Sequence, residues 1–243
     1  MRTVGVDLAA EPPTTAVVTI EWSPRGGRVT DVVLGANDEQ ILAAVPSADA
    51  VGIDCPLGWP ERFIDFVVAH RAGSVPASEL SGLALRRTLL RRATDAHVAA
   101  TSGVVPMSVS ADRIGSVAMR AAGLLAALDA GGEPVDRSGS GVVMEVYPAV
   151  ALKAWGLPHR SYKGVHNTGM LKSIVDAIAI DWGGSAELAR ASDHVLDATI
   201  CALIARAARL GRTALPPEEL LPLARSEGWI HVPTCSLAEL LSS

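Results

Sequence analysis

Three apolar segments of the chain each carry an acidic side chain at or near their carboxyl end. Asp7 closes VGVD, Asp54 closes VGID, and Glu145 lies near the end of VVMEVY. If these segments are adjacent parallel strands, the acids share one edge of a sheet, where open α/β folds bind their ligands. Carboxylates that converge in a partly buried place repel one another, and a bound divalent cation is the usual way to offset that repulsion.

A fourth acidic segment, Asp193-His194-Val195-Leu196-Asp197, opens a predicted helix. Because Asp193 and Asp197 are four residues apart, they share one face of that helix. The small apolar residues that follow suit packing on a sheet, and His194 is a candidate base. We predict two overlapping sets of acids: the metal ligands Asp7, Asp54, Asp193 and Asp197, and the catalytic acids Asp7, Asp54, Glu145 and Asp197.

The chemistry of these acids favours Mg²⁺ or Mn²⁺. Carboxylate oxygens suit those ions better than zinc, and the six histidines show no HxH or HExxH spacing. Two such ions, about 3.5–4 Å apart, can activate a water and stabilise the leaving oxygen in phosphodiester cleavage. The same acids would also serve to hold the metal of a nucleotide phosphate, so both chemistries stay open.

Several of these residues also have plainer explanations. Asp54 precedes Pro56-Leu57-Gly58, and an Asp at the end of a strand often serves as a turn former. Asp193 follows Ser192 and is equally typical of a helix start. The three cysteines are widely spaced, which indicates neither a disulfide framework nor a thiolate metal site. We interpret Cys55 as a buried thiol.

Candidate phosphate ligands are fewer. Arg87 and Arg91 lie four residues apart in RRTLLRR and would share a helical face, although a solvated face explains them equally well. Arg92 stands three residues before Asp95, which either pairs with it or approaches the metal site. The loop YKG would bring the Lys163 ammonium to a scissile phosphate or leave it on the surface. We predict the phosphate ligands Arg87, Arg91, Arg92 and Lys163.

The elements that must position these residues follow from the hydrophobic pattern. Apolar, β-branched segments predict five strands, at 3–8, 14–22, 28–34, 50–55 and 141–147. Short turns between the first three indicate an antiparallel meander, whereas the helical segment 38–45 makes 50–55 a parallel neighbour of the first strand. Further helices are predicted at 60–70, 80–99, 111–130, 149–155, 168–180, 192–210 and 217–227. This order predicts an α/β domain with a mixed five-stranded sheet, three antiparallel strands being followed by parallel crossovers.

Charge and composition narrow the possible functions. Lys and Arg number 21 against 26 Asp and Glu, a formal net charge of −5, and only 4% of residues are aromatic. Nucleic-acid binding must therefore come from a local basic patch. The opening residues MRTVGVDLAAEPP do not resemble a signal peptide, and the apolar stretch 195–208 is shorter than the roughly 20 residues of a membrane span. We expect a cytoplasmic protein that does not enter the membrane; its oligomeric state stays open, a homodimer included.

Many of these residues lie in motifs that resemble one known family. The motifs GVDLAAEPPTTAV, VGIDCPLGWPERF, RRATD, PMSVSADRIG, DRSGSG with EVYPA, WGL with SYKG, DHVLDATICALIARAA and EGWIHVP occur in this order between residues 5 and 233. Together they resemble the proteins grouped as domain of unknown function 429, which are described as predicted nucleases of the ribonuclease H-like superfamily. The resemblance implies a single ribonuclease H-like domain over residues 1–243, with helices on both faces of the sheet and a helical insertion at about 60–130.

In that superfamily the first strand, the crossover strand and a C-terminal helix supply the metal-binding acids. Carried onto this chain, those roles fall on Asp7, Asp54 and Asp197, with Asp193 as alternate or partner, whereas Glu145 belongs to the family's own EVYP motif. The resemblance thus implies a metal-dependent nuclease that uses Mg²⁺ or Mn²⁺ on DNA or RNA.

Two alternative functions stay open. One is a nucleotide-binding phosphotransferase of the sugar kinase and actin type, although this chain has no second GxDxG-like strand. The other is a non-catalytic binding module that keeps the fold. One geometric criterion bears on the nuclease prediction, because carboxylates more than about 8–10 Å apart would exclude a shared two-metal centre.

Overall fold

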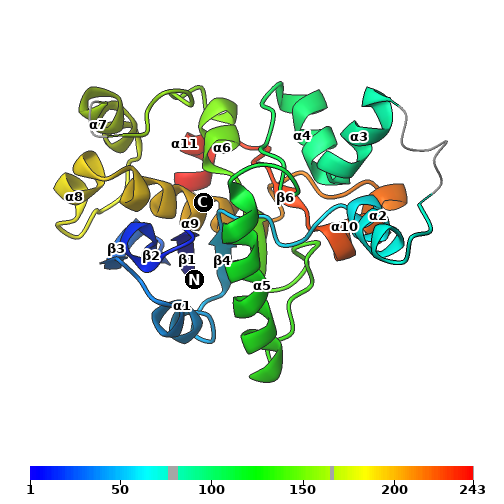
Figure 1. The fold of residues 1–243 in the computed structure, drawn as a ribbon. Coiled ribbons are helices and arrows are strands. Elements are labelled where there is room, and N and C mark those ends of the chain that lie inside the picture. Colours follow the sequence, from blue (N-terminus) through cyan, green and yellow to red (C-terminus); the bar gives the residue numbers. More distant parts are fainter. Residues whose placement is uncertain (76–81, 165–166, 243) are drawn as a thin grey trace.

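A six-stranded mixed sheet forms the centre of the molecule (Figure 1). The computed structural model describes residues 1–75, 82–164 and 167–242. The strands are β1 (Arg2–Asp7), β2 (Ala16–Ser23), β3 (Gly26–Leu34), β4 (Ala50–Ile53), β5 (Val143–Val146) and β6 (Ile230–His231). Their order across the sheet is β3-β2-β1-β4-β5-β6. The first three strands pair antiparallel, and β4, β5 and β6 continue the sheet parallel to β1.

This arrangement confirms the predicted α/β class and the mixed sheet whose first part is antiparallel. The predicted strand count of five is wrong, because β6 adds a sixth strand beside β5. That strand is two residues long. A segment so short cannot show the alternation of apolar and polar residues by which strands are recognised in a sequence.

Helices pack on both faces of the sheet. Within the described ranges the α-helices are α1 (Asp38–Ala44), α2 (Glu61–Arg71), α3 (Leu83–Leu90), α4 (Ala93–Ser102), α5 (Ile114–Ala130), α6 (Pro148–Ala154), α7 (Thr168–Ala177), α8 (Ala186–Ala191), α9 (Asp193–Arg209), α10 (Leu221–Glu227) and α11 (Leu237–Leu241). One face of the sheet is covered by α1 and α5, and the other by α9 with α6, α7, α8 and α11. Among the described residues, no helix combines the length and apolar character that a membrane crossing needs.

The chain between β4 and β5 is helical and carries α2, α3, α4 and α5. Here the single predicted helix 80–99 is wrong, since α3 and α4 cover the stretch separately; positions 80 and 81 lie outside the described residues. The backbone is extended at Arg91 (φ −127°, ψ 130°) and at Arg92 (φ −72°, ψ 163°). The N–H of Arg92 donates to the Asp95 carboxylate at 3.0 Å, which fixes a new helix start that the hydrophobic pattern does not reveal.

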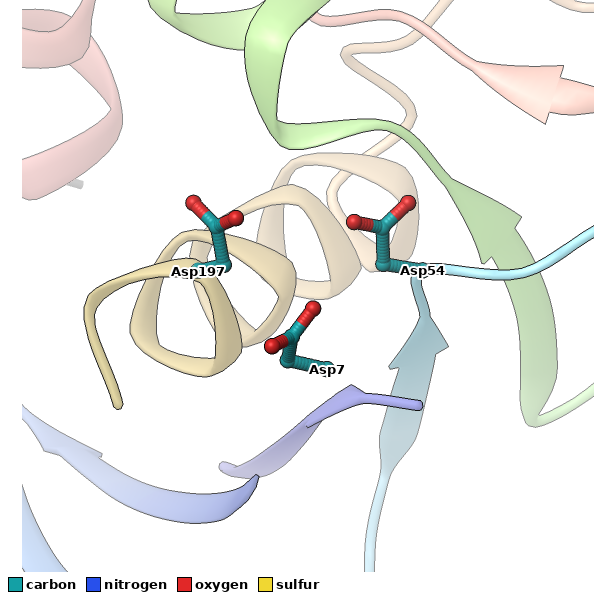
Figure 2. Close-up of side chains that lie close together, drawn as sticks. All are labelled: Asp7, Asp54 and Asp197. Atoms are coloured by element: carbon teal, nitrogen blue, oxygen red, sulfur yellow. The ribbon is translucent and has the colours of Figure 1, made fainter. Parts of the chain in front are cut away.

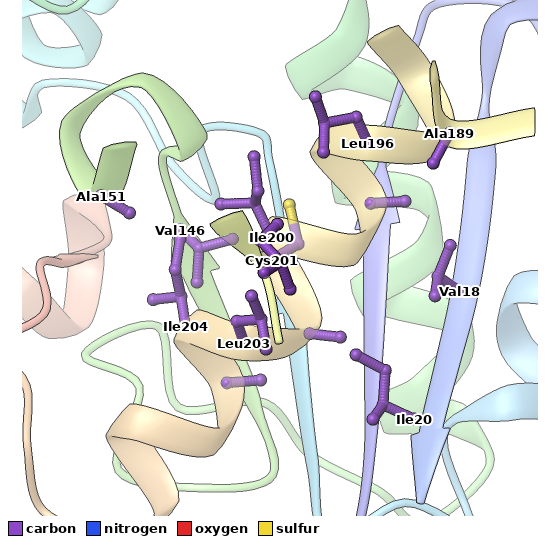
Figure 3. Packing of buried hydrophobic residues seen from close by; sticks show 14 of the residues in the cluster. Val18, Ile20, Val146, Ala151, Ala189, Leu196, Ile200, Cys201, Leu203 and Ile204 are labelled. Atoms are coloured by element: carbon purple, nitrogen blue, oxygen red, sulfur yellow. The ribbon is translucent and has the colours of Figure 1, made fainter. Parts of the chain in front are cut away.

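α9 is the central helix of the core. Its buried residues, among them Leu196, Ile200 and Ile204, pack with the strand residues Val18 and Val146 (Figure 3). Nearly the whole helix is buried, including positions on every side of it. A helix that is apolar all round must be covered on all sides, and here the sheet, α6, α7, α8 and α11 provide that cover.

Two glycines bring α9 close to the sheet. Gly5 of β1 and Gly52 of β4 pair in register. A Cβ atom on Gly5 would lie 1.9 Å from the carbonyl oxygen of Ala198, and one on Gly52 would lie 2.5 Å from that of Cys201. The backbone of α9 therefore rests directly on two adjacent strands, and its amino-terminal turns lie beside the carboxyl ends of those strands.

Candidate metal centre

Three aspartates converge where β1, β4 and α9 meet (Figure 2). Asp7 ends β1, Asp54 directly follows β4, and Asp197 lies one turn into α9. Each offers one carboxylate oxygen, and these three oxygens lie within 4.8 Å of one another. This separation is well inside the limit of about 8–10 Å beyond which a shared centre would be excluded.

The alternation of side chains between the two faces of the sheet explains why Asp7 and Asp54 meet. Val6 packs on the side of α1 and α5, so Gly5 and Asp7 point to the side of α9. The parallel register of Gly5 with Gly52 then places Asp54 beside Asp7 on the same side of the sheet. Asp7 and Asp54 thus each come two residues after a glycine that α9 covers, and Figure 2 shows their side chains gathered with that of Asp197.

Glu145 points the other way. In the register of β5 with β4, Glu145 lies beside Ile53, whose side chain belongs to the α1 and α5 side. Its carboxylate receives two hydrogen bonds of 2.7 Å from Arg92 and one of 3.0 Å from the backbone N–H of Leu57. Glu145, placed among the catalytic acids from the sequence, therefore lies outside the group of three aspartates. It still lines the same cavity as Asp7 and Asp54, and its charge adds to the rise in the pKa of Asp54.

Arg92 has no donor left for a phosphate. Its side chain is 1% exposed, and its five N–H groups donate to Asp95, Glu145 and the carbonyl oxygen of Glu227. The two carboxylates hold the pKa of this guanidinium above its usual value against the opposing effect of burial. Of the two roles left open for Asp95, the structure shows the pairing with Arg92. Arg92 itself forms a buried junction between α4, β5 and α10 in place of the predicted phosphate contact.

Two further predicted phosphate ligands, Arg87 and Arg91, and the fourth predicted acid, Asp193, lie apart from the three aspartates. Arg87 is exposed in the last turn of α3, whereas Arg91 is extended and donates to the carbonyl oxygen of Pro106 at 3.1 Å. They share no helical face because α3 ends between them. Asp193 accepts a hydrogen bond of 3.1 Å from the N–H of Gly164 and lies outside the group of three aspartates.

Two consecutive residues of one loop engage Asp197, which is itself 1% exposed. The Tyr162 hydroxyl donates to Asp197 Oδ1 at 2.8 Å, and Lys163 Nζ lies 2.6 Å from Asp197 Oδ2. Burial lowers the pKa of Lys163, but Asp197 and the other two aspartates outweigh that effect and raise it. Burial and Asp197 together raise the pKa of Tyr162. Asp197 is thus held by a neutral hydroxyl and a charged ammonium.

His194 binds the second carboxylate. Its Nδ1 lies 2.7 Å from Oδ2 of Asp7, and this hydrogen bond raises the pKa of the imidazole. The His194 side chain is 36% exposed. Its other ring nitrogen, Nε2, makes no hydrogen bond to any described residue and so can exchange a proton with water.

Asp54 lacks such a partner. Within the described part of the chain, its carboxylate has neither a hydrogen bond nor an ion pair. Burial raises its pKa well above the ordinary value, Lys163 opposes this, and Asp7 and Asp197 add to the rise. Burial likewise raises the pKa of Asp197 to about 6. The site therefore holds more negative charge than its own cations offset.

This donor set fits a divalent cation. Three carboxylates from different elements face one another, and the ligand atoms of this group are all oxygen. One of the carboxylates, that of Asp54, has no hydrogen-bond or ion-pair partner in the part of the chain that the structure describes. Oxygen-only ligation of this kind suits Mg²⁺ or Mn²⁺. A cation held by Asp7, Asp54 and Asp197 would lower the pKa values that burial and mutual repulsion raise.

Two features of this site were missed from the sequence. The contact between Tyr162 and Asp197 could have been suspected only from the adjacency of Tyr162 to Lys163. The second is the Gly-x-Asp pattern shared by VGVD and VGID, which marks the close approach of α9. The interpretation of Cys55 as a buried thiol agrees with its 2% exposure.

A cavity of about 450 Å³ opens beside the aspartates. Asp7 and Asp54 form part of its wall, together with Tyr162 and Lys163 from the loop that engages Asp197. Most of its remaining wall is apolar. A ligand in this cavity would therefore contact both the carboxylates and an apolar surface.

Comparison with known proteins gives one match. The model of a family described as "Protein of unknown function (DUF429)" matches residues 5–220, which is most of the chain. No curated protein and no solved structure matches.

Proposed function

The chain belongs to the DUF429 family, whose description assigns no activity, and we propose that it is a metal-dependent nuclease with a ribonuclease H-like fold. The observation that carries the proposal is the meeting of Asp7, Asp54 and Asp197 within 4.8 Å. Carboxylates at the ends of two neighbouring parallel strands and on a helix that crosses them are suited to hold one or two Mg²⁺ or Mn²⁺ ions.

The reaction we propose is hydrolysis of a phosphodiester in nucleic acid. Asp7, Asp54 and Asp197 would hold a divalent ion, which would supply positive charge for the phosphate oxygens and would make a water molecule a better nucleophile. The protein's own part is to hold the acids in place while they repel one another. The hydrogen bond from Tyr162 to Asp197 and that between His194 and Asp7 do so from two sides.

Lys163 and His194 supply further functions in this proposal. The Lys163 side chain is 53% exposed although its ammonium lies against Asp197, so the same ammonium can also contact a phosphate oxygen. His194 is oriented through Nδ1 by Asp7, which leaves Nε2 to take up or deliver a proton. Both residues come from segments next to the aspartates rather than from the predicted arginine cluster.

A cleavage screen tests this function. Single-stranded, duplex, hybrid and branched oligonucleotides are incubated with Mn²⁺ and with wild-type protein, Asp54→Asn or Asp65→Asn. Asp65 is an exposed residue of α2 that does not line the cavity beside the aspartates, and it provides the matched control. We expect Asp54→Asn to lower cleavage by about 100-fold or more, because a charged metal ligand is lost, and Asp65→Asn to behave as wild type.

Two results would overturn the proposal. One is cleavage that survives in Asp54→Asn, which would point to a contaminating nuclease. The other is Mn²⁺ binding, measured by calorimetry, with no cleavage of any substrate class. In that second case, release of phosphate from a nucleoside triphosphate would favour the phosphotransferase alternative.

A further inference from the structure

The cavity beside the aspartates has the composition of a base-binding pocket. We propose that it receives the base of a single unpaired nucleotide while the attached phosphate lies against the carboxylates. This inference rests on the proposed function and specifies its substrate: a nucleoside phosphate unit, either free or at an unpaired position of a strand. A paired base cannot enter, because its faces are stacked within the duplex.

The size and the lining of the cavity suit the base of a nucleotide. Its volume of about 450 Å³ lies within the range of roughly 300–1,000 Å³ that is usual for small-molecule sites. Apolar side chains from several separate segments form most of the wall, among them Leu8, Pro56, Met107, Ile114, Val146 and Ala149. A phosphodiester backbone alone would gain nothing from this apolar wall, whereas the face of a base would be buried against it.

An aromatic ring and a few polar side chains in the wall can stack with a base and orient it. The Tyr147 ring lies in the wall and offers a surface on which a base can stack. His159 and Ser161 also line the cavity, and neither side chain has a hydrogen-bond partner among the described residues. A few polar groups on an apolar wall are what fixes the orientation of a heterocycle, because its edge carries donors and acceptors and its faces do not.

The backbone at Ser161 joins the cavity to the aspartates. Among the described residues, Ser161 is the one non-glycine residue with a positive φ, 56°. Such a conformation is strained, and strain of this kind is concentrated at binding and catalytic sites. Ser161 lines the cavity, and the next two residues, Tyr162 and Lys163, engage Asp197. One loop therefore contacts both the proposed base-binding cavity and the proposed phosphate site at the aspartates.

A binding experiment separates base recognition from phosphate recognition. Calorimetry in Mn²⁺ compares adenosine 5′-monophosphate and uridine 5′-monophosphate with ribose 5-phosphate, which has the same phosphate but no base. We expect at least one nucleotide to bind about tenfold or more tightly than ribose 5-phosphate. Equal affinities of all three would overturn the inference.

Variants locate the effect in the cavity. Ala149→Phe fills it from α6, and Met107→Trp narrows it at a residue that is 49% exposed, so that folding is preserved even if the first variant fails. Met119→Trp, on the exposed side of α5, is the control. We expect the first two to bind the nucleotide no better than ribose 5-phosphate, with Mn²⁺ affinity unchanged. Nucleotide binding that survives both would overturn the inference.

Cleavage assays distinguish the two sources of the nucleotide and keep this inference apart from the proposed function. Cleavage of a single strand about tenfold faster than its duplex, with a loss at an abasic position, identifies an unpaired strand as the source. Equal cleavage of both, together with nucleotide affinity no greater than that of ribose 5-phosphate, would leave the nuclease in place and overturn the base pocket. Selective nucleotide binding with no strand cleavage would support the pocket for a free nucleotide and overturn the nuclease.

Discussion

Asp193 and Asp197 show how burial separates two acids that spacing alone treats as equal. Both occupy the first turns of α9, four residues apart. Asp197 is 1% exposed and is held by Tyr162 and Lys163, whereas Asp193 accepts, from the described residues, just the N–H of Gly164. The helical period predicts a shared face, but the depth of each position depends on how α9 meets the sheet. That contact is tertiary and has no signal in the local sequence.

The raised pKa of Asp197 predicts a pH dependence of stability in metal-free protein. In the folded state this pKa is about 6, against about 3.9 for an unfolded chain. Between those values the folded protein holds a proton that the unfolded chain has lost, so stability falls as pH rises from about 4 to about 6. Asp54, whose pKa is raised well above its ordinary value, adds to this fall, and His194, whose pKa is also raised, continues it at higher pH.

Asp197→Asn isolates the first part. We expect the free energy of unfolding of the variant, minus that of wild type, to increase by about 2 kcal/mol between about pH 4 and about pH 7, because the variant does not share the wild-type loss. Urea unfolding with EDTA at several pH values measures this difference. A difference that stays constant across the range would contradict the assignment of a raised pKa to Asp197.

Arg87 and Arg92, two of the predicted phosphate ligands, lie on either side of the break between α3 and α4. They differ in burial, as Asp193 and Asp197 do. Arg92→Ala leaves Glu145 and Asp95 buried without their partner, which should lower the free energy of unfolding by about 3–5 kcal/mol. Arg87→Ala, at an exposed position, should change it by less than about 0.5 kcal/mol. If Arg92→Ala yields no folded protein, Arg92→Lys measures the loss of the bidentate contacts. Equal stabilities of Arg92→Ala and Arg87→Ala would show that the buried junction is not formed.

At the scale of the elements, the contact of α9 with β1 and β4 depends on two side chains being absent. Gly5→Ala and Gly52→Ala place a methyl group against the backbone of α9, and each should destabilise the fold by about 3 kcal/mol. Gly123→Ala is the control, since nothing lies within 4 Å of a Cβ there. In the middle of α5 that change should stabilise by about 0.5–1 kcal/mol. Thermal unfolding of the three variants measures these effects. Equal changes in Tm for all three would show that α9 does not lie in close contact with β1 and β4.

The fold was predictable where local patterns are long. The strands around Asp7 and Asp54 and the helix that carries Asp197 were all identified from apolar runs, and so was the mixed sheet. Two features depend on tertiary contacts instead: the two-residue β6 and the register of β5. The break at Arg92 depends on the capping contact with Asp95, which the hydrophobic pattern does not show. A register shifted by one residue would have turned Glu145 toward the aspartates. Nothing in VVMEVY specifies that register.

For the whole molecule, the acidic balance of −5 is partly a property of this site. Three of the 26 acidic residues repel one another at one point, so a cation that binds there should stabilise the native state. A free cation concentration of about 100 times the dissociation constant stabilises the native state by about 2.7 kcal/mol. For a chain of this length, this stabilisation raises Tm by roughly 5–10 °C.

Thermal unfolding at neutral pH with Mg²⁺, with Mn²⁺ and with EDTA tests this prediction. Asp7→Asn should abolish most of the rise, whereas Asp65→Asn should keep it. A rise of equal size in Asp7→Asn would mean that the ions stabilise the protein elsewhere.

The positions 7, 54 and 197 also have a kinetic consequence. No short stretch of chain contains two of these aspartates, so the centre exists only after β1 has paired with β4 and α9 has packed over both. Contacts between such distant segments are the slow ones in folding. An ion that needs all three carboxylates can therefore bind only after the rate-limiting step. Added Mn²⁺ should slow unfolding and leave the rate of refolding almost unchanged. The metal would then stabilise the native state after it has formed and would not assist its formation.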